Sequence, residues 1–365
     1  MTVTALAWVV GGVAALLSIA LPVAVRPLLV RLGIMDVPNE RSSHERPVLR
    51  GLGLAVLIAI AIAEGIAVAV LVGSDDASGG WRVLLIVALG TFASGMLGLA
   101  EDLRGLSVGV RSVLLLGIAL AAAVALLIMA PAGGGVATAI GDGAASFGWT
   151  AGVGALPLWA SVLLAIYAVL FISSYINVAN FMDGLNGISG FHGVIAGLTF
   201  AVSGWFAGMP WLIVAGAALA AGFAGFLPWN LTKPGAFLGD VGSYLLGGAV
   251  AITSFAALVS GVPLLATIGP MVICFGDVAV TLVKRVRTGH RWDEPHKEHA
   301  YQRIQQLGYS HVQASACTAG ASLLTSALGL ASFFTGLGGA LLLLVAGLAV
   351  LVVYLLLPRL LPNRS

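Results

Sequence analysis

The chain has 365 residues, of which 59% are hydrophobic and only 9% are charged, and its mean hydropathy is +1.06. Soluble domains carry about 25% charged residues, so this composition excludes a water-soluble fold. The formal net charge of +2 is uninformative by itself, because the positions of the charges matter more than their sum. We expect a membrane protein without a nucleic-acid partner.

Apolar runs long enough to cross about 30 Å of hydrocarbon recur along the whole chain. The first run lacks a basic segment before it, so we predict a retained helix and not a removed signal peptide. No polar stretch could form a separate soluble domain, so residues 1–365 are predicted to be a single polytopic membrane domain of the all-α integral membrane class. Hydropathy predicts a bundle of eleven transmembrane helices, at residues 4–25, 51–73, 81–100, 110–130, 157–176, 187–204, 211–228, 242–260, 262–284, 312–334 and 337–358.

The basic residues predict the orientation, because cytoplasmic loops carry an excess of Lys and Arg. With the N-terminus outside, all of the 17 Lys and Arg residues except Arg82 fall in segments that face the cytoplasm. We therefore predict an outside N-terminus and a cytoplasmic C-terminus. The same loops hold nearly all of the His, Asn and Asp residues, so function is predicted to face the cytoplasm. The main cytoplasmic loops are predicted at residues 26–50, 101–109, 177–187, 229–241 and 285–311.

The first predicted cytoplasmic loop is rich in Arg, His and Pro. Positive-inside anchoring and attraction to anionic lipid explain its arginines. They do not explain His44, or the prolines that stiffen the loop. Arg41 and His44 are therefore candidates for binding substrate.

Two adjacent acids, Glu101 and Asp102, follow the third predicted helix directly. They could be ordinary surface charges on a short loop, but carboxylates at a membrane edge are costly unless they are solvated or paired. Arg104 and Arg111 follow closely in the sequence. A basic residue here could hold a phosphate while a carboxylate binds metal or accepts a proton.

The segment after the fifth predicted helix carries Asn177, Asn180 and Asp183 at a spacing of three. If the helix continues through this segment, the three side chains share one face. Oxygen ligands at a membrane edge suit a hard cation such as Mg²⁺, and Gly184 would admit a phosphate close to the backbone. The alternative is a polar turn whose Asn and Gly residues cap helices.

Asp240 and Ser243 open the eighth predicted helix, between glycines. Both residue types are common helix caps, and an acid is favourable near the positive end of a helix. A capping role and a ligand role are compatible here. The flanking glycines make a ligand role for Asp240 more attractive.

His296 and His299 lie in the last long polar loop, three residues apart, so they could share one helical face and bind phosphate or sugar. A zinc site is less favoured because no clear third ligand accompanies them. Of the acids inside predicted helices, Asp277 is a functional candidate. Glu64, which no motif accompanies, is predicted to be structural.

Taken together and in chain order, these motifs resemble the polyprenyl-phosphate N-acetylhexosamine-1-phosphate transferase family, part of glycosyltransferase family 4, which includes the phospho-MurNAc-pentapeptide translocases. The resemblance covers nearly the whole chain. The run from His299 to Arg303 is more similar to members that begin O-antigen or capsule repeat units than to the translocases. The matching motifs are Asp36-x-Pro38-x-x-Arg41-x-x-His44, Glu101-Asp102, Asn177-x-x-Asn180-x-x-Asp183-Gly184, Gly239-Asp240-x-Gly242-Ser243 and Pro295-His296-x-x-His299.

The resemblance implies a bound Mg²⁺, for which Mn²⁺ could substitute, held by Asn180, Asp183 and Asp240 beside the nucleotide diphosphate. It also implies that the histidine loop lies next to the diphosphate and sugar. The expected catalytic residues are Glu101, Asp102, Asp183, Asp240, His296 and His299. The expected substrate-binding residues are Arg41, His44, Arg104, Arg111, Asn177, Asn180, Gly184, Asn186, Ser243 and Arg303.

The sequence departs from the family pattern at two positions. The acid pair is normally Asp-Asp, and Glu101 replaces its first member, so a base role is less secure for Glu101 than for Asp102. The translocases also carry a lysine three residues after the pair, where this chain has Gly105. Arg104 could replace that lysine only imperfectly, because Arg and Lys bind phosphate differently.

The predicted reaction is transfer of an (N-acetyl)sugar 1-phosphate from a UDP-sugar to undecaprenyl phosphate at the bacterial inner membrane. It would release UMP and start a lipid-linked glycan for the cell wall or for lipopolysaccharide O-antigen. Such a reaction needs mainly positioning and charge neutralisation, which fits these residue types. The alternatives are a polyprenyl pyrophosphate phosphatase and an ion-coupled secondary transporter, although a transporter would place its charges near the midplane. The resemblance also suggests a homodimer, and membrane lipid surrounds the chain.

Overall fold

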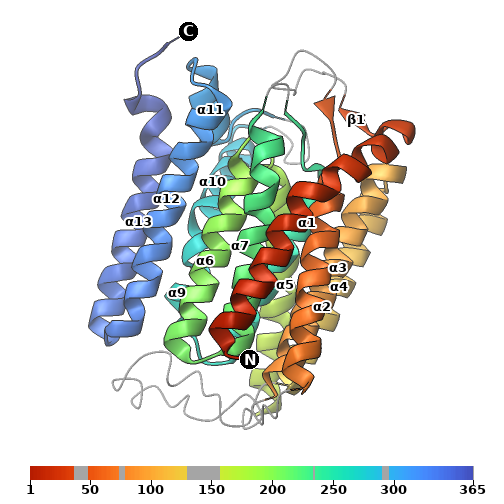
Figure 1. The fold of residues 1–365 in the computed structure, drawn as a ribbon. Helices are drawn as coiled ribbons and strands as arrows, with labels where there is room; N and C mark the ends of the chain where they lie inside the picture. Colours follow the sequence, from red (N-terminus) through yellow and green to blue (C-terminus); the bar gives the residue numbers. More distant parts are fainter. Residues whose placement is uncertain (37–47, 74–78, 130–156, 233–234, 290–295, 365) are drawn as a thin grey trace.

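The computed structural model describes residues 1–36, 48–73, 79–129, 157–232, 235–289 and 296–364. The long helices run side by side as one bundle, with the first residue and the last described residue at opposite ends of it (Figure 1). Within the described residues, 11 helical segments are long and apolar enough to cross a membrane. This confirms the prediction of an all-α membrane bundle of about eleven spans.

The helices that build the bundle differ in length, and the two shortest are 3-10 helices. The 3-10 helix η4 (Gly269–Met271) joins α9 to α10 into one span, and η5 (Ser332–Phe334) follows α12. The α-helices are α1 (Val3–Arg31), α2 (Gly53–Gly73), α3 (Gly80–Arg104), α4 (Val108–Met129), α5 (Leu158–Met182), α6 (Ile188–Ala207), α7 (Pro210–Leu231), α8 (Gly239–Val259), α9 (Leu264–Ile268), α10 (Val272–Arg287), α11 (Ala300–Gln306), α12 (His311–Ala331) and α13 (Leu337–Leu360).

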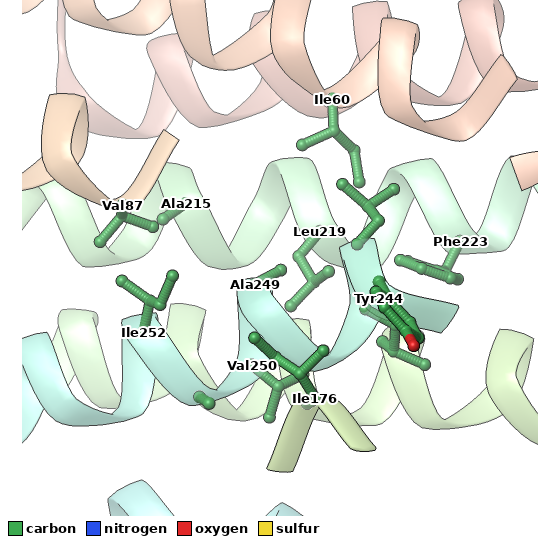
Figure 2. Packing of buried hydrophobic residues seen from close by; sticks show 14 of the residues in the cluster. Ile60, Val87, Ile176, Ala215, Leu219, Phe223, Tyr244, Ala249, Val250 and Ile252 are labelled. Atoms are coloured by element: carbon green, nitrogen blue, oxygen red, sulfur yellow. The ribbon is translucent and has the colours of Figure 1, made fainter. Parts of the chain in front are cut away.

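Helix α8 forms the centre of the bundle. It packs against α2, α3, α5 and α7, and 94% of its most apolar stretch is buried. Figure 2 shows side chains from these neighbours, such as Ile60, Ile176 and Phe223, around Tyr244 and Val250 of α8. Helix α13 is the opposite case, with only 6% of its apolar stretch buried. The start of α8 is therefore held rigidly by its surroundings.

Three helices extend more than three residues beyond the predicted ends, and all three extensions lie at the same end of the bundle. Helix α1 continues to Arg31, and α3 continues to Arg104, so Glu101 and Asp102 lie in the last turn of a helix and not in a loop. Helix α5 continues through Asn177 and Asn180 to Met182. A helix satisfies its own backbone hydrogen bonds, so it need not end where its apolar run ends.

A short extended segment closes this end of the bundle against the start of α8. Strand β1 (Met35–Asp36) pairs antiparallel with β2 (Val48–Leu49), with Met35 opposite Leu49. On the other side, the Phe237 amide donates to the Leu49 carbonyl at 2.9 Å, and the Leu52 amide donates to the Phe237 carbonyl at 3.2 Å. Residues 49–53 are therefore tied to the segment that enters α8.

Candidate active site

The ends of α3, α5 and α8 meet at this end of the bundle, next to residues 50–53. Two glycines allow the close approach. A Cβ atom on Gly98 of α3 would collide with the Asp240 carbonyl, and one on Gly53 would collide with the backbone of Gly242. Close backbone contact at small residues is typical of membrane helices. It brings together three carboxylates that are far apart in the sequence, those of Asp102, Asp183 and Asp240, which we name the acidic cluster.

Asp102 fixes the start of α8. Its two carboxylate oxygens accept hydrogen bonds from the backbone amides of Asp240 at 3.1 Å and Val241 at 2.8 Å. Backbone amides in the first turn of a helix lack partners within the helix and carry a partial positive charge. A carboxylate from α3 thus caps α8, which leaves the side chain of Asp240 available for another role.

Arg50 supplies the positive charge that faces the acidic cluster. Its Nε lies 3.1 Å from the Asp102 carboxylate, and its Nη2 lies 2.7 Å from the Asp240 carboxylate. Sequence reasoning counted Arg50 only as a topology signal. Arg50 lies immediately before an apolar run, where a basic residue is expected from membrane topology alone. Only the pairing of residues 49–53 with Phe237 brings it to Asp240.

Asn180 and Asn177 lie one turn apart on α5 but have different partners. The Asn180 amide nitrogen donates to the Asp240 carboxylate at 2.8 Å and to the Ser243 hydroxyl at 3.0 Å. Asn180 and Ser243 therefore orient Asp240, and the Asn180 amide oxygen is the atom that a metal ion would take. The Asn177 amide instead donates to the Ser173 carbonyl of its own helix at 2.9 Å, so it does not reach the cluster through this group.

Asp183 ends α5 and is the third member of the acidic cluster. The Ser189 hydroxyl donates to its carboxylate at 2.6 Å. Burial raises the pKa of Asp183 to about 7, against the lowering effect of the Ser189 hydrogen bond, and the negative charges of Asp240 and Asp102 raise it further. A cation that binds next to a buried carboxyl group with a raised pKa stabilises its deprotonated, negatively charged form.

The acidic cluster has unbalanced negative charge, but its side chains alone do not make a metal site. Three carboxylates and one guanidinium leave two formal negative charges to be balanced. Among the described residues, no group of three or more His, Cys, Asp or Glu side chains is arranged so that it could hold a metal ion by itself. Mg²⁺ is usually bound through one or two carboxylates together with water and substrate phosphates. Asp183 and Asp240 with the Asn180 oxygen match that incomplete set.

Glu101 points away from its neighbour Asp102. Its carboxylate accepts from the Leu106 amide at 3.1 Å and lies 3.4 Å from the Arg111 guanidinium. Arg111, Glu101 and Asp240 all lie close enough to Tyr244 of α8 to act on it electrostatically, so this pair lies next to the acidic cluster. Arg104 is exposed at the end of α3, and none of the ion pairs between described residues involves it.

The connection between α5 and α6 packs on the helix that carries the histidine motif. Gly184 lies directly against the Tyr301 ring of α11, where no side chain would fit, and the Tyr301 hydroxyl donates to the Phe181 carbonyl at 3.0 Å. The Asn186 amide donates to the Asn230 carbonyl at 2.8 Å. Asn230, which sequence reasoning missed, thus shapes this turn. Two motifs that are more than a hundred residues apart in the sequence therefore form one surface.

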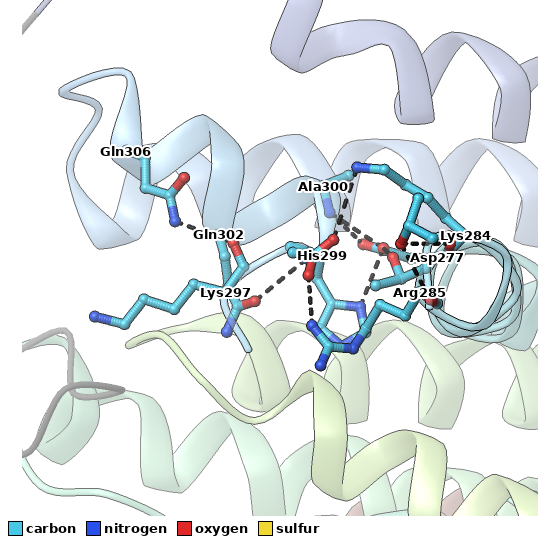
Figure 3. Close-up of polar contacts among 11 residues, drawn as sticks. Asp277, Lys284, Arg285, Lys297, His299, Ala300, Gln302 and Gln306 are labelled. Carbon is cyan, nitrogen blue, oxygen red and sulfur yellow. Dashed lines mark hydrogen bonds and ion pairs between the residues drawn. The ribbon is translucent and has the colours of Figure 1, made fainter. Parts of the chain in front are cut away.

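His299 is buried at the start of α11 and is oriented by Asp277. Its Nδ1 lies 3.2 Å from the Asp277 carboxylate, which also accepts from the Ala300 amide at 3.0 and 3.1 Å (Figure 3). The Tyr354 hydroxyl of α13 donates to the same carboxylate at 3.0 Å. Asp277, a functional candidate from the sequence, thus contacts a histidine and the first residue of α11. Arg303, a predicted substrate-binding residue, lies partly buried one turn further along α11.

His296 has an unused polar atom beside His299. The two rings have centroids 4.9 Å apart, and the buried Nδ1 of His296 has no hydrogen-bond partner among the described residues. Burial and electrostatic interactions with His299 and Arg285 lower the pKa of His296 to about 4. His296 is therefore neutral at pH 7 and is free to donate or accept one hydrogen bond.

Two predicted site residues, Arg41 and His44, lie in the segment 37–47, outside the described residues. Of the others, the structure brings Asp102, Asp183 and Asp240 together with Asn180 and Ser243. It places His296 and His299 on a neighbouring segment that contacts the same α5–α6 connection through α11.

Comparison with known proteins shows which protein family this chain resembles. A family model described as glycosyl transferase family 4 matches residues 84–258, a range that includes the whole acidic cluster but neither Arg50 nor the two histidines. Over 292 residues, 79% of this chain and 74% of the relative, the chain is 27% identical to a probable undecaprenyl-phosphate N-acetylglucosaminyl 1-phosphate transferase of Bacillus subtilis.

Two further relatives match over long stretches. A decaprenyl-phosphate N-acetylglucosaminephosphotransferase of Mycolicibacterium smegmatis is 29% identical over 337 residues, which is 84% of this chain and 77% of the relative. A phospho-N-acetylmuramoyl-pentapeptide-transferase of Desulforudis audaxviator is 29% identical over 261 residues, which is 66% of this chain and 73% of the relative. All three alignments are long compared with a single motif.

Proposed function

Because this chain belongs to glycosyl transferase family 4, we propose that it transfers an N-acetylhexosamine 1-phosphate from a UDP-sugar to undecaprenyl phosphate and releases UMP. The chain is a multi-pass membrane transferase. Two of its relatives are named for polyprenyl phosphate acceptors, and all three are named for N-acetylated sugars. The observation that carries the proposal is the acidic cluster with Arg50, at one end of the bundle.

Mg²⁺, or Mn²⁺ in its place, would be held by Asp183 and Asp240 with the Asn180 oxygen. When bound, the ion would neutralise charge on the diphosphate of the sugar donor. Asn180 and Ser243 orient Asp240 by hydrogen bonds, and Asp102 holds the helix start that carries it. These residues would keep the donor diphosphate in position for attack.

The reaction would form a bond between an oxygen of the lipid phosphate and the sugar-linked phosphorus of the donor. The bond from that phosphorus to the UMP oxygen would break, and UMP would leave. An acceptor phosphate at the headgroup plane would lie beside these helix ends, where Arg50 and Arg111 supply positive charge. Neutral His296, with its unused Nδ1, would bind the diphosphate or the sugar.

The Lys and Arg distribution supports placing this site on the cytoplasmic face of the bacterial inner membrane, with the N-terminus outside. The acidic cluster lies where α3, α5 and α8 end or begin, and not at the midplane, where transporters bind their substrates. The proposed homodimer, and a place in lipopolysaccharide O-antigen or cell-wall synthesis, rest on the family resemblance.

The test is an assay of the purified protein in nanodiscs with UDP-N-acetylglucosamine, undecaprenyl phosphate and Mg²⁺. We expect UMP and a lipid-linked sugar in equal amounts. Asp183→Asn and Asp240→Asn should each lower UMP release at least about 100-fold, as removal of one strong transition-state contact does. A panel of UDP-sugars would then identify the sugar.

A matched control for these variants is Glu64→Gln. It also converts a carboxyl to an amide, but Glu64 lies on α2 about 16 Å along the helix from Gly53, and we expect its UMP release to equal that of the wild type. Orthophosphate release without UMP would indicate the phosphatase, and ion-driven uptake without UMP would indicate the transporter. Wild-type turnover in both Asp variants would refute the proposed metal site.

A further inference from the structure

We propose that Arg50 is an exchangeable counter-ion: it binds Asp102 and Asp240 when no divalent cation is present, and it transfers its contact from Asp240 to a substrate phosphate when the cation binds. This inference rests on the proposed function, since it takes a nucleoside diphosphate and a divalent cation as the ligands of this site. It assigns Arg50 a role that the motifs in the sequence do not.

The two contacts of Arg50 differ in a way that suits exchange. The Asp102 carboxylate is 1% exposed and is fixed by two backbone amides, so the contact with Arg50 Nε is the permanent one. The Asp240 side chain is 18% exposed, and the Arg50 side chain is 38% exposed. The contact between Nη2 and Asp240 therefore lies on the open side of the cluster, where a ligand can enter.

The backbone around Arg50 is held in place, so only the side chain needs to move. The Arg50 amide donates to the Ile34 carbonyl at 3.2 Å, and the Gly53 amide donates to the Leu238 carbonyl at 2.9 Å. With the Phe237 pairing these contacts fix the segment on both sides. A small rotation of the guanidinium about its Asp102 contact would redirect Nη2 without unfolding the loop.

Both oxygens of Asp240 are already used by the protein. Oδ1 accepts from Asn180, and Oδ2 pairs with Arg50 Nη2 at 2.7 Å. A divalent cation that binds Asp240 would be close to the guanidinium, and the two positive charges repel each other. The arriving cation would therefore displace Nη2 from Asp240.

A phosphate is the ligand that the displaced group suits. The guanidinium presents several N–H donors in one plane, so it can keep one carboxylate and bind a phosphate oxygen at the same time. The ammonium of lysine presents its three N–H donors from one nitrogen, so it is less suited than the planar guanidinium to span two separate partners. The metal-bound diphosphate would thus replace Asp240 as the partner of Arg50.

The test measures metal binding and nucleotide binding separately in Arg50→Gln and Arg50→Lys. Mn²⁺ binding is followed by electron paramagnetic resonance without nucleotide, and UDP binding is followed by calorimetry with saturating Mg²⁺. Arg50→Gln should bind Mn²⁺ at least about 3-fold more tightly, because the competing cation is gone, and UDP at least about 10-fold more weakly, because a charged phosphate contact is lost. Arg50→Lys should recover less than half of the loss in UDP affinity, on a logarithmic scale.

The matched control is Arg31→Gln, which removes the same charge from an exposed residue at the same end of the bundle. It should leave both affinities unchanged. If Arg50→Gln weakens Mn²⁺ and UDP binding together, Arg50 is structural and the proposal is wrong; unchanged affinities also overturn it. A wild-type protein that neither binds Mn²⁺ nor releases UMP would refute the proposed function itself. If the wild-type protein releases UMP but Arg50→Gln binds Mn²⁺ no more tightly than the wild type, only the proposed exchange is refuted.

Discussion

Replacing Asp102 by Asn should loosen the start of α8, because Asp102 accepts two backbone amides there with its two oxygens. The Asn side chain keeps one acceptor oxygen and presents an NH₂ group to the other amide. Asp102→Asn should therefore lower UMP release by displacing Asp240, and not by removing a group that touches the substrate.

The magnitude follows from these contacts. A hydrogen bond to a charged group contributes about 2 kcal/mol, and a buried amide left without an acceptor costs about 1 kcal/mol more. The pair with Arg50 is discounted, since the Arg50 side chain is 38% exposed. A local loss of about 3 kcal/mol lowers the protection of the affected amides against hydrogen exchange about 150-fold.

Hydrogen exchange with mass spectrometry, on protein in nanodiscs, would measure this in a peptide that covers the start of α8. Asp183→Asn is the comparison, because it removes a carboxylate of the same cluster that makes no hydrogen bond to these amides. Both variants should lose activity, but only Asp102→Asn should lose protection at Asp240 and Val241. If Asp102→Asn loses activity while protection stays at the wild-type value, Asp102 acts directly on the reactants and the capping argument is wrong.

Two further perturbations test the metal site and the packing that builds it. Burial raises the pKa of Asp183 to about 7, and a cation binds the deprotonated form. Mn²⁺ affinity should therefore rise about tenfold per pH unit below pH 7 and level off above it. In Asp183→Asn this pH dependence should vanish, and an unchanged pH dependence would show that another group causes it. Gly98→Ala should destabilise the protein by about 1–3 kcal/mol and lower UMP release, because its Cβ would collide with the backbone at the start of α8. Gly117→Ala on α4, which has open space around it, should change neither thermal stability nor turnover, and equal effects of the two would refute the packing argument.

The number of spanning helices was predictable because each apolar run must cross the same thickness of hydrocarbon. Helix ends were less predictable. Hydropathy ended the third helix at residue 100, whereas α3 continues to Arg104, since polar residues at the membrane edge can stay helical. That difference decides the roles of two acids. Consecutive residues on a helix point about 100° apart, so Asp102 faces α8 while Glu101 faces Arg111.

The site was predictable in part. The spacing of Asn180 and Asp183 and the glycines around Asp240 indicated a shared ligand, and the structure brings these residues together. Arg50 was missed because its role depends on the pairing of residues 49–53 with Phe237, about 190 residues away in the sequence, and no local pattern encodes that pairing. Whether the cluster binds Mg²⁺ remains a prediction.

The contact between Tyr354 and Asp277 has a consequence for the last helix. Helix α13 is the least buried span, with 6% of its apolar stretch buried, and by that measure it resembles a peripheral addition to the bundle. Yet its one tyrosine supports the carboxylate that orients His299, and beyond it the Arg364 amide donates to the Leu307 carbonyl at 2.7 Å. A chain that stopped after α12 would keep every carboxylate of the acidic cluster, but its histidine segment would lose two of its supports.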